Sequence, residues 1–231
     1  MIDLHSHILP EMDDGSESRE MSLAMLDVMA RHGVETVVAT PHFYASRDLP
    51  EAFLERRDKA LALLGQVKPE HPKLLWGAEV AYFDGMGRSA QVLERLRLGD
   101  SKLLLVEMPF GKWNTRMVRE ICDLPLQTGL TPVLAHVDRY RQKDQLLGNM
   151  DQLLDCGVLF QCNAEAFLRF GSRGWALKLI RNGMVHFLGS DTHNLTTRQP
   201  NLGDAARVIE KKLGGETLED LMAFSRQQLL G

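Results

Sequence analysis

Two pairs of potential metal ligands in this sequence are each separated by a single residue. His5 and His7 lie near the N-terminus, and Asp191 and His193 lie near the other end of the chain. Side chains at positions i and i+2 of an extended strand point to the same face. Each pair is therefore expected to present two ligand atoms to one ion.

Five more residues of the same chemical types follow apolar runs or turns elsewhere, namely Asp14, His42, Glu79, Glu107 and His136. One ion takes about four to six ligands, so nine candidates predict two or three ions that share bridging carboxylates. Imidazole and carboxylate without cysteine favour Mn, Fe, Zn or Ni over Cu(I) or Ca. Centres of this kind activate water and stabilise displacement at phosphorus.

Asp14 has a second interpretation. Asp14 and Glu17 have capping-box spacing at the start of a helix predicted over residues 17–32, and the Asp13-Asp14-Gly15 segment is typical of an Asx turn. The sequence leaves open whether Asp14 binds metal or caps the helix.

Two arginines follow the candidate ligands closely. Arg139 stands three residues after His136, and Arg198 stands five residues after His193. A guanidinium fork matches phosphate oxygens in bidentate fashion. Both arginines are therefore candidates for phosphate binding, although each could also pair with a surface carboxylate.

The elements that must position these residues alternate between strands and helices. Strands are predicted over 2–5, 34–40, 74–80, 102–107, 131–136, 157–162 and 184–190, and helices over 17–32, 51–65, 88–97, 114–128, 143–155, 174–182, 203–213 and 216–229. Such alternation indicates parallel βαβ units in a single α/β domain over residues 1–231, either a doubly wound sheet or a barrel. The candidate ligands fall at the carboxyl ends of the strands, where active sites of such folds are built.

Composition excludes several other classes of protein. The chain has 231 residues and a net charge of −4, so it lacks the basic field of a nucleic-acid-binding protein. No run has the ~18 apolar residues of a membrane span. The three cysteines form no CxxC motif, and the N-terminus lacks the features of a signal peptide, so we expect a reducing, cytoplasmic location.

Longer motifs make the sequence resemble a known family. The segments IDLHSHILPEMDDGSES, ATPHF, GAEV, AHVDRY and GSDTHNLTTRQPNL together resemble the polymerase-and-histidinol-phosphatase (PHP) superfamily. Within it, they are most similar to the bacterial capsule-type tyrosine-protein phosphatases, the CpsB/YwqE-like group. The resemblance covers residues 2 to about 205.

This resemblance implies a distorted (β/α)7 TIM-like barrel with three divalent transition-metal ions, manganese first, with iron or zinc as alternatives. By motif position, it assigns His5, His7, Glu79 and Asp191 to one ion, Glu79, Glu107 and His136 to a second, and Asp14, His42 and His193 to a third. It also implies that Arg139 and Arg198 bind phosphate. The implied substrate is phosphotyrosine on the tail of a bacterial tyrosine autokinase that controls capsule or exopolysaccharide assembly.

Other functions remain open at this point. The same chemistry would suit a small-metabolite phosphatase such as a histidinol-phosphatase, and a non-catalytic regulatory module could keep the metals for folding alone. A C–N hydrolase of the amidohydrolase type is disfavoured because Glu107 and Asn163 stand where that class needs Lys and His. Four aromatic residues in two predicted loops are candidates for contact with a phosphotyrosine ring: Phe43, Tyr44, Phe110 and Trp113.

Overall fold

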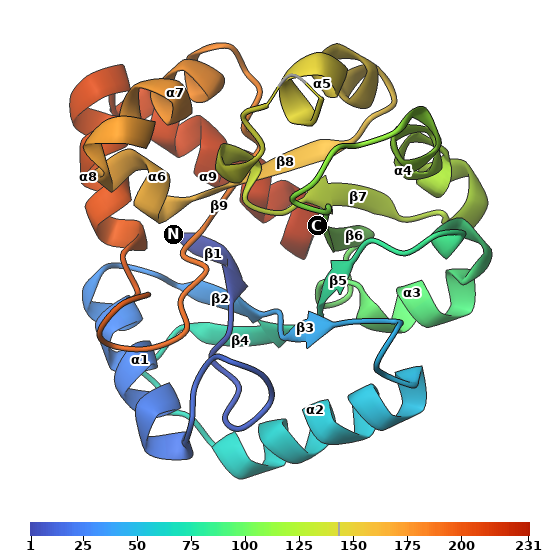
Figure 1. Ribbon diagram of the computed structural model, residues 1–231. Helices are drawn as coiled ribbons and strands as arrows, with labels where there is room; N and C mark the ends of the chain where they lie inside the picture. The colour runs from blue at the N-terminus through green and yellow to red at the C-terminus, as the bar shows by residue number, and fades with distance from the viewer. Residues whose placement is uncertain (143) are drawn as a thin grey trace.

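Parallel strands form the centre of the molecule (Figure 1). The computed structural model describes residues 1–142 and 144–231. One sheet has the order β1-β2-β4 and the other has the order β3-β5-β6-β7-β8-β9. The bounds are β1 (Ile2–Ser6), β2 (Thr36–Ala39), β3 (His42–Phe43), β4 (Lys73–Trp76), β5 (Glu79–Ala81), β6 (Leu103–Glu107), β7 (Thr131–Leu134), β8 (Leu159–Asn163) and β9 (Phe187–Gly189).

Two of the seven barrel strands are each broken into halves. The strand predicted over 34–40 corresponds to β2, and β3 continues it beyond the predicted range after Pro41. The strand predicted over 74–80 is divided into β4 and β5, with Gly77 at the break. Proline has no N–H for the ladder, which explains the first interruption. The halves pair with different sheets, and this break distorts the barrel.

The two sheets meet at a seam between β1 and β9. Only an isolated bridge joins Ser6 to Thr192 among the described residues there, and the Asp3 carboxylate accepts a hydrogen bond from the Ser190 N–H at 2.8 Å. A buried side chain thus takes over part of the role of a strand ladder. The distorted (β/α)7 barrel predicted from the sequence is confirmed.

Helices surround the strands in Figure 1, and α9 passes behind them. The bounds are α1 (Arg19–Arg31), α2 (Pro50–Leu64), α3 (Ala90–Leu96), α4 (Thr115–Thr128), α5 (Leu146–Asp155), α6 (Ala164–Leu168), α7 (Phe170–Arg181), α8 (Leu202–Leu213) and α9 (Gly215–Leu230). The helix predicted from residue 143 begins at Leu146, and residue 143 itself lies outside the described residues. In the described part of the chain, we find no helix with the length and hydropathy to cross a membrane.

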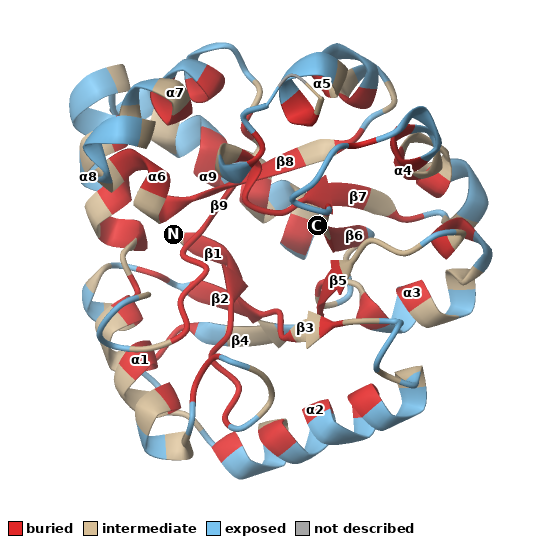
Figure 2. Ribbon diagram, viewed as in Figure 1, coloured by how far each residue is buried: buried red, intermediate tan, exposed pale blue. Residues whose placement is uncertain are grey.

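Side chains on opposite faces of the strands enter different clusters. In β6, Leu104 and Val106 join the large core between strands and helices, whereas Leu103 and Leu105 join a smaller cluster. That smaller cluster draws on β1, β2, β6, β7 and β9, so it fills the space that the strands enclose. Leu229 of α9 belongs to it and closes the end of the barrel where the strands begin. Figure 2 shows most of the strands buried, β4 partly exposed and the outer helix faces exposed.

The region after β8 differs from the prediction. A short helix, α6, follows β8 directly, and α7 begins at Phe170 rather than at residue 174. Gly171 and Gly174 weaken the helical pattern in the sequence. Tertiary contacts override this weakness because the Arg173 guanidinium donates to the carbonyls of Phe167 and Leu168 at 2.7 and 2.6 Å.

Gly189 lies where the barrel admits no side chain. A Cβ atom there would stand 2.6 Å from His5 Cβ and 2.7 Å from Gln161 Nε2. We expect Gly189→Ala to lower the free energy of unfolding by about 1–3 kcal/mol because of overpacking. The matched control is Gly174→Ala in α7, where nothing lies within 4 Å and where alanine should stabilise the helix by about 0.5–1 kcal/mol. Denaturant unfolding in the presence of chelator measures both, and equal stability of the two variants would contradict this prediction.

Candidate metal centre

All nine predicted ligands reach the same end of the barrel because parallel strands finish together. β1 and the turn after it deliver His5, His7 and Asp14, and the other strand ends deliver His42, Glu79, Glu107, His136, Asp191 and His193. The register places His42 of β3 directly opposite Glu79 of β5. His136 and Asp191 have positive φ values of 35° and 53°. Such backbone is costly outside glycine and clusters at functional sites.

Glu79 is the centre of the group. Its Oε2 atom lies 3.2 Å from His5 Nε2, 3.4 Å from His7 Nε2 and 3.0 Å from His42 Nδ1. Its other oxygen, Oε1, lies 2.9 Å from His136 Nε2. Burial favours the neutral acid, but the surrounding histidines prevail and hold the pKa of Glu79 well below its usual value.

Residues outside the predicted set orient the first two imidazoles. Asp13 Oδ2 accepts a hydrogen bond from His7 Nδ1 at 2.7 Å, and Gln161 Oε1 accepts one from His5 Nδ1 at 3.1 Å. With the proton on Nδ1, the Nε2 lone pair of each ring is directed at the centre. The two Nε2 atoms are 3.1 Å apart and face the Glu79 carboxylate.

This convergence of lone pairs and negative charge fits a cation. Among the described residues, Glu79 Oε2 and His42 Nδ1 are both buried and lie 3.0 Å apart, but their geometry makes no hydrogen bond and neither atom has another hydrogen-bond partner. Burial alone would lower the pKa of His7, but the Asp13 and Glu79 carboxylates raise it to about 10. The site therefore demands positive charge, and its donor set suits a divalent transition metal.

In the part of the chain that the structure describes, three overlapping groups have ligand atoms within 4.8 Å of one another. His5, His7 and Glu79 form one, and Asp191 Oδ1 lies 3.6 Å from both of these histidines. The other two groups are His7 with Asp14, His42 and His193, and His42 with Glu79 and Glu107. His136 Nε2 lies 3.3 Å from Glu107. His7 and His42 thus join more groups than the family motifs assign to them.

Asp14 has an exposed side chain at the rim and does not cap α1. Its Oδ1 lies 3.6 Å from His42 Nε2 and 3.4 Å from His193 Nε2. The N-cap of α1 is Ser18, whose hydroxyl accepts from the Met21 N–H. The capping interpretation is therefore wrong, and the turn-forming carboxylate is Asp13, which accepts from the Gly15 N–H at 3.0 Å.

Both predicted arginines contact Asp191. Arg139 Nη2 lies 2.5 Å from one carboxylate oxygen, and Arg198 Nη2 lies 2.6 Å from the other. Arg198 Nη1 also donates to His193 Nε2 at 2.7 Å. Burial, together with the charges of His7 and Arg198, lowers the pKa of His193 to about 4, which favours the neutral imidazole that metal binding requires. The arginines are half-buried beside the metal cluster.

The four candidate aromatic residues divide into two pairs. Phe43 is buried against Phe53, and the Trp113 indole is buried with its N–H donated to Pro109, so neither can contact a substrate ring. The prediction that Phe43 and Trp113 contact a substrate ring is wrong, because both side chains pack in the apolar core. Phe110 is 55% exposed and lies nearly parallel to His136, with ring centroids 5.8 Å apart. Tyr44 stacks on His42 at 5.3 Å.

Asp13 and Gln161 are the functional positions that the sequence prediction missed. Asp13 adjoins Asp14 in the same turn, so residue type alone could not separate a ligand from an orienting group. Gln161 did carry a signal, since it is a polar residue inside the apolar run over 157–162. Buried polar side chains in strands need a partner, and here the partners are His5 and the His136 N–H.

Comparison with known proteins identifies relatives over the whole chain. The family model for capsular polysaccharide synthesis, CpsB/CapC, matches residues 1–231. The tyrosine-protein phosphatase CpsB of Streptococcus agalactiae serotype III (strain NEM316) is 28% identical, covering 100% of this chain and 98% of the relative. The tyrosine-protein phosphatase YwqE of Bacillus subtilis (strain 168) is 32% identical, covering 94% of this chain and 86% of the relative.

Comparison with solved structures identifies the same group of relatives. A structure from the work on YwqE of Bacillus subtilis and CpsB of Streptococcus pneumoniae, described as metal-dependent tyrosine phosphatases, superposes with a TM-score of 0.85 at 30% identity. It covers 100% of this chain and 94% of that one. The histidinol phosphate phosphatase of Lactococcus lactis is 18% identical with a TM-score of 0.51, covers 91% of this chain and 92% of that one, and shares the fold alone.

Asp13→Asn should weaken metal binding about 10- to 100-fold, since loss of a group that orients a ligand histidine typically has this effect. Asn keeps the shape but removes the charge that holds His7 at 2.7 Å. The matched control is Asp27→Asn, which alters a second Asp–His pair, with His71 at 2.8 Å, outside the metal centre. Competition with a chromophoric chelator measures affinity. Equal affinities of the Asp13 and Asp27 variants would assign Asp13 a purely structural role.

Proposed function

The chain belongs to the CpsB/CapC family of capsular polysaccharide synthesis, and we propose that it is a metal-dependent phosphomonoester hydrolase that acts on phosphotyrosine in proteins. The proposal treats residues 1–231 as one phosphatase domain. Its support is the named activity of the relatives together with one observation in this chain: a buried carboxylate faced by imidazole lone pairs, beside two arginines that can bind an anion.

The proposed cofactors are three divalent ions, manganese first, with iron or zinc as alternatives. His5, His7, Glu79 and Asp191 would hold one ion, with Glu79 shared with a second at Glu107 and His136. Asp14, His42 and His193 would hold the third, and the proximity of His7 and His42 to several groups supports shared ligands. When bound, such ions supply activated water and neutralise phosphoryl oxygens.

The protein's own contribution is to bind and orient the phosphate. Arg139 and Arg198 approach the metal centre from the Asp191 side, with side chains 34% and 32% exposed. Each guanidinium has donors to spare for phosphate oxygens, and its fixed fork favours bidentate contact. Electrostatic stabilisation by such preorganised donors is typically the largest contribution to catalysis of this type.

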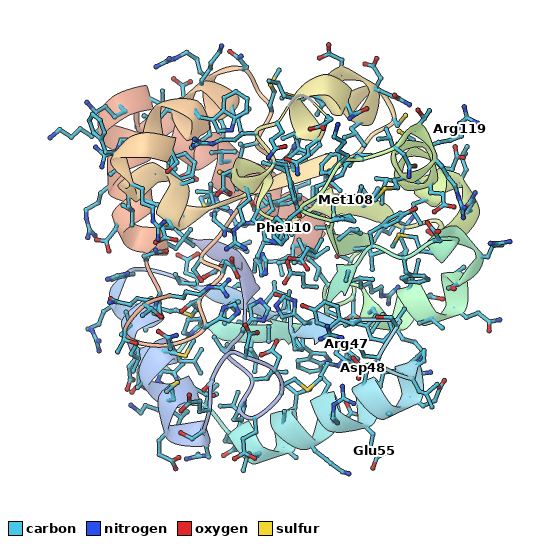
Figure 3. The ribbon with its side chains drawn as sticks, in the orientation of Figure 1. Arg47, Asp48, Glu55, Met108, Phe110 and Arg119 are labelled. Carbon is cyan, nitrogen blue, oxygen red and sulfur yellow. The ribbon has the colours of Figure 1, made fainter. Side chains whose placement is uncertain are left out.

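The rim favours an aryl phosphate. Phe110 and Tyr44 stand at the mouth beside His136 and His42, and Figure 3 shows Phe110 near the centre of the barrel mouth. Aromatic side chains in these places can stack against a phosphotyrosine ring. We propose the phosphotyrosine tail of a bacterial tyrosine autokinase as partner, in capsule or exopolysaccharide control, and a cytoplasmic location, which suits three free cysteines.

The decisive test compares substrates with the metal varied. We expect kcat/KM for phosphotyrosine peptides to exceed that for phosphoserine peptides and histidinol phosphate by at least tenfold, because ring contacts and the better leaving group both favour the aryl ester. Metal analysis of the same samples should give at least two equivalents. A tenfold preference for histidinol phosphate would establish the metabolite phosphatase instead, and metal binding without turnover would indicate a regulatory module.

Arg198→Ala should lower kcat/KM by roughly 30- to 1000-fold, equivalent to about 2–4 kcal/mol of transition-state stabilisation. Metal content should be retained, and Arg198→Lys should restore little activity because the fork is lost. Arg207→Ala is the control, since Arg207 also pairs with an aspartate but lies in α8. Near-native turnover of the Arg198 variant would transfer the phosphate-binding role to Arg139.

A further inference from the structure

A cleft of about 420 Å³ opens beside the metal centre. Arg139 and Asn163 connect the cleft to the metal centre, because each donates a hydrogen bond to the Asp191 carboxylate and also lines the cleft. Arg141 and Arg169 line it farther out. We call this feature the arginine cleft. A substrate held at the metal centre by Arg139 therefore has this cleft as its immediate neighbour.

The outer two arginines are available to a ligand. Arg141 donates to the Gly171 carbonyl at 3.2 Å, and within the described residues no carboxylate comes within 4 Å of it. Arg169 pairs with Glu165 at 2.7 Å, but these side chains are 70% and 39% exposed. Exposed pairs contribute about 0–1 kcal/mol, so an incoming anion can readily compete for Arg169.

The remaining acid in the wall does not neutralise these arginines. Asp138 directs its Oδ1 at the backbone N–H of Asn163, at 2.9 Å. That contact orients the carboxylate towards the end of β8. The lining as a whole has three arginines against the two carboxylates of Asp138 and Glu165, so its net charge is positive.

The opposite side of the metal centre differs in charge. A cleft of about 430 Å³ there is lined by Tyr44, Arg47, Asp48 and Arg56, among others. Arg56 is bound to Asp48 at 2.6 Å, and Arg47 lies over the Tyr44 ring at 5.0 Å. Its cations are thus already engaged, and Asp13 and Asp14 add negative charge. Of these two clefts, the arginine cleft is the one whose charge favours an anion.

We propose that the arginine cleft binds a second anionic group of a peptide substrate, close in sequence to the phosphotyrosine. The group is a carboxylate of Asp or Glu or a second phosphate, since a guanidinium recognises both. Strand residues i and i+2 are about 7 Å apart, so an anion one or two positions from the phosphotyrosine can reach a cleft that adjoins Arg139. This inference rests on the proposed phosphatase activity and specifies its substrate as acidic or multiply phosphorylated peptides.

The test uses the metal-loaded full chain and three phosphotyrosine peptides of equal length, with neutral neighbours, with Glu two positions away, or with a second phosphotyrosine there. For the peptides with Glu or a second phosphotyrosine, we expect kcat/KM to be about tenfold higher than for the neutral peptide, mainly because KM is lower. In the double variant Arg141→Gln/Arg169→Gln, the ratio of kcat/KM for the acidic peptide to kcat/KM for the neutral peptide should fall towards one. Arg119→Gln removes one charge from α4 at the outer edge of the barrel (Figure 3) and should leave the ratio unchanged.

The outcomes separate the two proposals. Gain from both acidic peptides supports a general anion site, and gain from the second phosphate alone supports a phosphate site. Turnover of all peptides with equal kcat/KM, or a preference that survives in the double variant, would overturn the arginine cleft but not the phosphatase. If no peptide is hydrolysed, binding of peptides with a non-hydrolysable phosphonate analogue decides: equal affinity for neutral and acidic forms refutes the cleft, and selective affinity lost in the double variant supports it.

Discussion

A buried carboxylate enclosed by imidazoles is the constraint around which the barrel mouth is organised. Glu79 is 1% exposed, and four histidines from three other strand ends and a turn surround it. A charge removed from water costs several kcal/mol unless partners compensate for it. Those partners come from distant parts of the chain, so the strands must end at matching levels. The breaks in the second and third barrel strands serve this requirement, because they place His42 and Glu79 side by side in β3 and β5.

A layer of polar side chains around this group decides which atoms the histidines present. Asp13 and Gln161 accept the Nδ1 protons of His7 and His5, so the Nε2 atoms face inwards. The Gln161 amide also donates to Asn163, whose amide donates to the Asp191 carboxylate. These two hydrogen bonds connect β8 to the loop after β9. Each link satisfies a buried polar group, and the contacts of Asp13 and Gln161 also fix the tautomers of His7 and His5, which supports the preorganisation that a metal centre needs.

The two ends of the barrel have different roles. α9 closes the end where the strands begin, with Leu229 in the interior cluster, so that end contributes stability. The other end carries the metal centre with an acidic cleft that contains Tyr44 on one side and the arginine cleft on the other. A peptide that crosses the mouth would therefore meet unlike surfaces on its two sides, which is a physical basis for selecting sequence around a phosphotyrosine.

The sequence by itself determined the alternation of elements and the residue types at the carboxyl ends of the strands. These follow from local periodicity and from the rule that parallel strands end together. Periodicity left a doubly wound sheet and a barrel both open, and only the family resemblance implied the distorted barrel. The sequence did not determine the roles of Asp13 and Asp14, which are adjacent and chemically identical, or the burial of Phe43 and Trp113, or the early start of α7. Only the tertiary structure decided these, because each depends on which atoms meet across elements: Asp13 meets His7 and the His42 N–H, whereas Asp14 extends to the rim. Spacing along the chain reports the face on which a side chain lies, but hydrogen bonding and burial are settled by partners distant in sequence.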